Sequence, residues 1–135
     1  INGFNLNFID TVGFIRDLPT TLIDSFKSTL NEIINSDLIL HVRDISDSEY
    51  LDQKNEVLKI LEEIGVQKDD ERIIEVINKT DLVKNKINYH NSFSEKSVMI
   101  SAANGFGISE LKNIIIKNLR KYNLIKFLHQ QSYQV

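Results

Sequence analysis

Four consecutive residues carry the most specific chemistry in this chain. They are Asn78-Lys79-Thr80-Asp81, and they directly follow the apolar run of residues 73–77. The Asp81 carboxylate can accept two N–H bonds from guanine, at N1 and at the exocyclic N2. Adenine has no such donor pair and would leave a buried acceptor unpaired, at a cost of about 1–3 kcal/mol. Lys79 can lay its alkyl stem along the flat face of the base, and Asn78 can tie the base to neighbouring loops. The pattern predicts a guanine-reading site.

A second candidate site comes early in the chain. Asp10-Thr11-Val12-Gly13 follows the strand-like residues 4–9. The Asp10 carboxylate can hold a magnesium ion through water. The Gly13 N–H can approach a γ-phosphate because no Cβ is in the way. We expect all four residues to belong to a GTP-binding site.

A third candidate segment, Ser101-Ala102-Ala103, follows the short apolar run of residues 98–100. Small residues here let backbone N–H groups reach the guanine O6. Each of the three segments comes just after a predicted strand, which is where ligands bind in open α/β sheets. Their order and placement together predict one guanine-nucleotide site.

The N-terminal part of the chain, around Asp10–Gly13, resembles the HflX-type GTPases. These belong to the Obg/HflX group of translation-associated GTPases. The resemblance rests on residues 10–19 (DTVGFIRDLP), residues 26–32 (FKSTLNE) and residues 36–44 (SDLILHVRD). It extends from about Asn5 to Leu119. Arg43 departs from the pattern, because an apolar residue is usual in this strand. We expect this arginine to weaken the sheet or to mark a drifting sequence.

The resemblance implies a fold and a function. The fold is a P-loop NTPase-type three-layer α/β/α sandwich. The function is GTP binding with Mg²⁺, slow GTP hydrolysis and action on the large ribosomal subunit. Proteins of this type are linked to the splitting of stalled ribosomes under stress. A cytoplasmic location is also implied, and the absence of cysteine is compatible with it. Phe14 stands where many GTPases have a water-orienting glutamine, so the catalytic group stays unknown.

The chain contains no Gly-x-x-x-x-Gly-Lys-Ser/Thr phosphate loop. By resemblance, that loop and the strand before it lie N-terminal to residue 1. We therefore expect residues 1–122 to be a partial GTPase domain that is inactive by itself, and residues 123–135 to be a tail or the start of a further connection. Two alternatives stay open: a truncated, non-catalytic fragment that binds the ribosome or a protein, and an inert remnant of a split gene.

Strand-like and helix-like runs alternate, which predicts a parallel sheet covered by helices. The expected strands are 5–10, 37–42, 73–77 and 97–100. The expected helices are 20–35, 47–64 and 109–121, with Asp47 as a cap and Gly65 as a stop. We expect His41 to be a packed core residue. A net charge of −3 over 135 residues gives no global attraction to RNA, and no run approaches the roughly 18 apolar residues of a membrane span.

Overall fold

The computed structural model describes residues 5–10, 30–83 and 96–132, with side chains up to residue 123. Within them, residues 30–35 are helical. The elements that follow are β1 (Ile39–Asp44), α2 (Tyr50–Glu63), β2 (Ile73–Asn78), the 3-10 helix η1 (Thr80–Leu82), β3 (Ser97–Met99) and α3 (Ile108–Ser132). Contacts divide the chain into two compact units. One contains residues 1–36 and 51–70, and the other contains residues 37–50 and 71–135.

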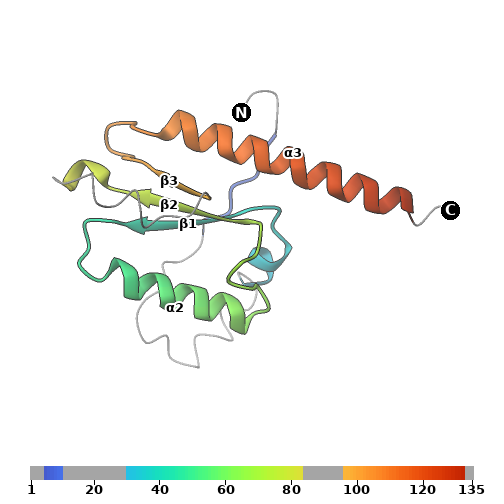
Figure 1. Cartoon of the computed structure of the whole chain (residues 1–135), viewed down its shortest axis with the longest axis horizontal. Coiled ribbons are helices and arrows are strands. Elements are labelled where there is room, and N and C mark those ends of the chain that lie inside the picture. Colours follow the sequence, from blue (N-terminus) through green and yellow to red (C-terminus); the bar gives the residue numbers. More distant parts are fainter. Residues whose placement is uncertain (1–4, 11–29, 84–95, 133–135) are drawn as a thin grey trace. The chain divides into compact units, whose positions relative to one another are not determined.

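The larger unit is built on a parallel sheet with the strand order β1-β2-β3 (Figure 1). Ile39 to Asp44 pair in register with Ile73 to Asn78, and Glu75 to Ile77 pair with Ser97 to Met99. All five residues from Ile73 to Ile77 are buried, as a central parallel strand requires. The predicted α/β class with a parallel sheet is confirmed, and three of the four predicted strands are present.

One face of the sheet carries the apolar core of this unit. Ile74, Val76, Val98 and Ile100 form its buried centre. The start of α3 packs against this centre through Ile108, Leu111 and Ile114. The alternation of side chains along β2 and the helical spacing on α3 account for this packing.

The smaller unit contains α2, whose apolar face buries Leu58 and Leu61. Gly65 ends the helix with a φ of 93°. The Gly65 N–H donates to the Glu62 carbonyl at 3.0 Å and the Val66 N–H to the Leu61 carbonyl at 2.8 Å. The predicted glycine stop is confirmed, because these bonds satisfy carbonyls that the end of a helix leaves open.

Three expectations about the elements differ from the structure. Residues 5–10 form no strand, and Phe8 and Ile9 are exposed. A strand exists only when its backbone bonds to a neighbour, and among the described residues the ladders join β1, β2 and β3 alone. Asp47 is not the residue that caps α2, because α2 begins at Tyr50, three residues later.

The final helix also continues past its predicted end at Lys121, to Ser132. Residues 122–132 contain no proline or glycine, so nothing in their composition ends the helix earlier. The division into a domain of residues 1–122 and a tail stays a prediction, although its boundary falls inside α3.

Candidate guanine-binding site

The ends of two parallel strands bring the predicted guanine-reading residues together. β2 ends at Asn78, and β3 leads through Ile100 into Ser101 and Ala102. The Ile100 N–H donates to the Ile77 carbonyl at 2.8 Å, and the Thr80 N–H donates to the Ile100 carbonyl at 3.2 Å. These bonds hold the two segments side by side at the carboxyl edge of the sheet, as expected for a ligand site in this class of fold.

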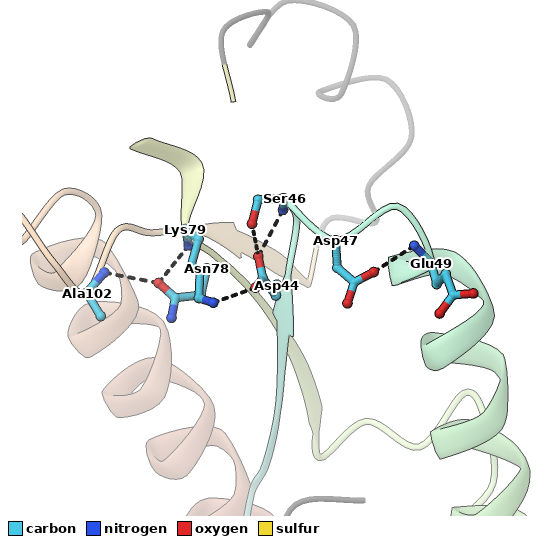
Figure 2. Close-up of polar contacts among 7 residues, drawn as sticks. All are labelled: Asp44, Ser46, Asp47, Glu49, Asn78, Lys79 and Ala102. Atoms are coloured by element: carbon cyan, nitrogen blue, oxygen red, sulfur yellow. Dashed lines mark hydrogen bonds and ion pairs between the residues drawn. The ribbon is translucent and has the colours of Figure 1, made fainter. Parts of the chain in front are cut away.

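Asn78 joins the two segments through its side-chain oxygen. Its Oδ1 accepts the Lys79 N–H at 2.8 Å and the Ala102 N–H at 3.0 Å (Figure 2). The bond from Ala102 joins the loop after β3 to the end of β2. The expected role of Asn78 in tying the base to neighbouring loops stays a prediction. The expected donation from the Ala102 N–H to a guanine O6 stays a prediction, because in this structure that N–H donates to Asn78.

Lys79 has an unusual backbone conformation. Its φ is 62° and its ψ is 33°, in the left-handed region that non-glycine residues rarely occupy. It is the only non-glycine residue with a positive φ in the described part of the chain. Its N–H bond to Asn78 and its carbonyl, which accepts the Leu82 N–H at 3.0 Å, hold this conformation. Strained residues of this kind concentrate at functional sites.

Asp81 is exposed, and one of its oxygens already has a protein partner. Ser101 Oγ donates to Asp81 Oδ1 at 2.6 Å. Ser101 is fully buried, so its hydroxyl is a fixed donor that orients the carboxylate. A carboxylate has about four lone-pair positions, so the orientation leaves acceptors for two further N–H groups. Ala102 and Ala103, which directly follow Ser101, are both exposed. Their methyl groups are too small to cover the carboxylate.

Two residues at this edge were not predicted from the sequence. Asp44, the last residue of β1, places Oδ2 2.6 Å from Lys79 Nζ. Its other oxygen, Oδ1, accepts the Ser46 N–H at 2.9 Å and the Ser46 hydroxyl at 2.6 Å (Figure 2). An aspartate at the end of an apolar strand, with a serine two residues later, is a signal for such a turn, and it could have identified Ser46. Nothing in the local sequence indicates the contact with Lys79.

The ion pair between Asp44 and Lys79 shifts both groups. Desolvation raises the pKa of Asp44, but hydrogen bonds from Lys79 and Ser46 outweigh it and leave the pKa below its usual 3.8. The hydrogen bond to Asp44 raises the pKa of Lys79 above its usual 10.5. Both groups are therefore charged at neutral pH.

The predicted phosphate and magnesium residues are placed only in part. Asp10 is exposed and belongs to the smaller unit, and Thr11, Val12 and Gly13 lie outside the described residues. In the described ranges no three His, Cys, Asp or Glu residues gather as metal ligands. Of the predicted phosphate and magnesium residues only Asp10 is described, and a carboxylate is a ligand type that Mg²⁺ prefers, directly or through water.

Residues 1–79 match the family described as 50S ribosome-binding GTPase. The chain belongs to this family.

The HflX relatives include one from Flavobacterium psychrophilum, which is 35% identical over 91% of this chain and 35% of the relative. Another, from Lacrimispora saccharolytica, is 41% identical over 89% of this chain and 29% of the relative. The chain is an HflX-type member, as the sequence resemblance predicted. It spans about a third of the length of these curated relatives.

A crystal structure of a mutation variant of SsGBP aligns with a TM-score of 0.69 and 28% identity. The alignment covers 86% of this chain and 43% of that chain. The likeness supports the P-loop NTPase-type fold for the HflX-type chain. Within the described ranges, none of its helices is long and apolar enough to cross a membrane.

Proposed function

We propose that this chain supplies the guanine-reading part of an HflX-type GTPase. In this proposal, Asp81 accepts the guanine N1 and N2 hydrogens, and the Lys79 stem lies along the base. The observation that supports it best is the pair of hydrogen bonds that the backbone N–H groups of Lys79 and Ala102 donate to Asn78 Oδ1. The bond from Ala102 joins the two segments whose sequences separately predict guanine contact, and the bond from Lys79 holds the first of them in place.

Base selection then follows from hydrogen-bond chemistry. Ser101 orients the Asp81 carboxylate, so its acceptor geometry exists before the base arrives. Guanine offers a matching donor pair, while adenine leaves the acceptors unpaired. A site built to bond one partner rejects the analogue that lacks the donors far more strongly than an apolar pocket does.

The remaining parts of the proposal follow from family membership. GTP would be the substrate, the Asp10 carboxylate would hold Mg²⁺ through water, and the Gly13 N–H would contact the γ-phosphate. Mg²⁺ would neutralise charge on the phosphate oxygens. The large ribosomal subunit is the proposed partner, ribosome splitting under stress the proposed role, and the cytoplasm the proposed location. The chain alone is proposed to be inactive, because it contains no phosphate loop.

The test uses what we call the extended protein: this chain joined at Ile1 to the segment that precedes the matched region in the Flavobacterium psychrophilum HflX. Competition of GTP, GDP and ATP against a fluorescent GTP analogue measures base choice. Phosphate release measures hydrolysis, and co-sedimentation with large ribosomal subunits measures the partner. We expect GTP and GDP to compete at least 100-fold better than ATP. Equal competition by ATP would refute the guanine-reading role.

A further inference from the structure

We propose that Asp44 is a positioning residue for guanine recognition, acting through the ammonium group of Lys79. This inference rests on the proposed function, because it assigns to Asp44 the task of holding the lysine stem that lies along the base. Asp44 belongs to β1, whereas the base-reading residues follow β2 and β3. The proposal therefore adds the end of a third strand to the site.

The two oxygens of Asp44 have separate partners. Ser46 binds Oδ1 through both its N–H and its hydroxyl, at 2.9 and 2.6 Å. Oδ2 lies 2.6 Å from Lys79 Nζ (Figure 2). Because Ser46 fixes the carboxylate plane, Oδ2 is a defined point to which the ammonium is drawn. Charge-assisted bonds of this length are stronger than neutral ones.

The loop that carries Ser46 is itself tied to the site. The Ile45 N–H donates to the Asn78 carbonyl at 3.1 Å, which continues the β1–β2 ladder into the loop. At the other end of the loop, Arg43 Nη1 donates to the Tyr50 carbonyl at 3.3 Å. The backbone beside Asp44 is therefore bonded to Asn78, the residue that precedes Lys79.

These contacts fix both ends of the Lys79 side chain. Its start is set by the left-handed backbone at φ 62°, and its end is set by Asp44. The side chain remains about half exposed, so part of its stem is open to solvent. A free lysine loses rotamer freedom when it is immobilised on a ligand. A stem that is already held loses less of it, which improves affinity by preorganisation.

A purely local role for Asp44 is the rival explanation. In that case Asp44 would only close the turn with Ser46, and its effect on ligand binding would not depend on Lys79. Asp47 provides a matched control, because it lies in the same loop and its charge acts on Lys79 through space. Its own bond is to the Glu49 N–H at 2.9 Å (Figure 2), and an asparagine at position 47 keeps that acceptor oxygen.

The experiment measures GDP and ADP binding to the extended protein by calorimetry. The variants are Asp44→Asn, Asp47→Asn, Lys79→Met and the double variant Asp44→Asn with Lys79→Met. We expect Asp44→Asn to weaken GDP binding about 3- to 10-fold, the range set by immobilising one flexible side chain. We expect Asp47→Asn to change it by less than about twofold, as a screened surface charge does. In the Lys79→Met background, Asp44→Asn should have no further effect.

Each outcome has a distinct meaning. If the unsubstituted extended protein does not prefer GDP to ADP, the proposed guanine-reading function fails. If it does prefer GDP, but Asp44→Asn binds like Asp47→Asn, the positioning role fails. An undiminished Asp44→Asn effect in the Lys79→Met background also overturns it, because Asp44 then acts locally.

Ser46→Ala provides a second route if Asp44→Asn does not fold. It loosens the same carboxylate without changing charge, and should weaken GDP binding only when Lys79 is present. Unchanged GDP binding by this variant would count against the positioning role.

Discussion

Arg43 and Glu75 form an ion pair across two neighbouring strands, with Arg43 Nη2 2.8 Å from Glu75 Oε2. Their side chains are only 3% and 11% exposed. The Arg43 guanidinium also lies 5.6 Å from the centre of the Tyr50 ring. The arginine that departs from the HflX pattern therefore has a buried counter-ion. This pairing lowers the cost of burying the arginine in the sheet, which the expectation of a weakened sheet did not take into account.

The pair predicts an asymmetric response to substitution. Glu75→Leu in the extended protein leaves the buried guanidinium uncompensated, and should lower the free energy of unfolding by about 3–5 kcal/mol. Adding Arg43→Leu should recover much of that loss, because no buried charge then remains. Urea unfolding measures both. Glu71→Leu, which breaks the exposed pair with Lys121, is the control and should change stability by less than about 1 kcal/mol. Equal losses at positions 71 and 75 would contradict this interpretation.

Gly107 is expected to tolerate no side chain. It has a φ of 72°, and an added Cβ would clash with the Met99 carbonyl oxygen at the end of β3. Gly107→Ala should destabilise the extended protein by more than Gly105→Ala. Position 105 has a similar φ of 83° but has open space around it, so only the left-handed backbone costs energy there, about 1–2 kcal/mol. Thermal unfolding compares the two variants. Matching melting temperatures would show that the Met99 carbonyl can move away from the added Cβ at no cost in stability.

The Asp44–Lys79 pair predicts a response to acid. Because the Asp44 pKa is lowered, its contribution to stability is present above the unfolded value of about 3.9 and is lost as the pH falls through the lower folded value. The Lys79 pKa is raised, so its contribution is present below about 10.4 and is lost as the pH rises through the folded value. Carbon-13 NMR titration should place the Asp44 midpoint below 3.8, and Lys79→Met should raise it.

The matched control for this titration is Lys68→Met, which removes the exposed partner of Glu62. It should leave the Asp44 midpoint unchanged. A midpoint at or above 3.8 in the unsubstituted protein would show that the ion pair does not form in solution.

Base choice is predicted to depend on Asp81. With asparagine at this position, one acceptor becomes a donor that faces the exocyclic amine of guanine. Xanthine has a carbonyl there and can accept the bond. One mispaired buried contact is worth roughly 1–3 kcal/mol, so Asp81→Asn should shift preference from GTP toward XTP by more than about tenfold. Competition of GTP, XTP and ATP in the extended protein measures the shift. An unchanged ratio of GTP to XTP affinity would mean that Asp81 does not read the base.

The 135-residue chain by itself is predicted to bind GTP weakly, because its sequence contains no phosphate loop to hold the triphosphate. Titration with a fluorescent GTP analogue in magnesium tests this. Submicromolar binding would contradict the prediction, while the extended protein serves as the positive control.

The sequence by itself predicted most of the elements that the structure describes and identified the candidate base-reading residues. Apolar runs with strand and helix periodicity identified β1, β2, β3, α2 and α3, because periodicity is a local property. Asn78, Lys79 and Asp81 were also identified locally, since they are contiguous and follow a strand. The same local signals failed for residues 5–10, because a strand also needs a hydrogen-bonded neighbour.

Only the tertiary structure decided which side chains meet. Asp44 and Lys79 are far apart along the chain but come together because parallel strands end at one edge of the sheet. Arg43 and Glu75 meet for a related reason. The register of β1 and β2 places Arg43 two residues from the position opposite Glu75, on the same face of the sheet. Ser101 reaches Asp81 across two strand ends. Such contacts depend on strand order and register. Both are set by the packing of distant segments, which cannot be read from a local sequence pattern.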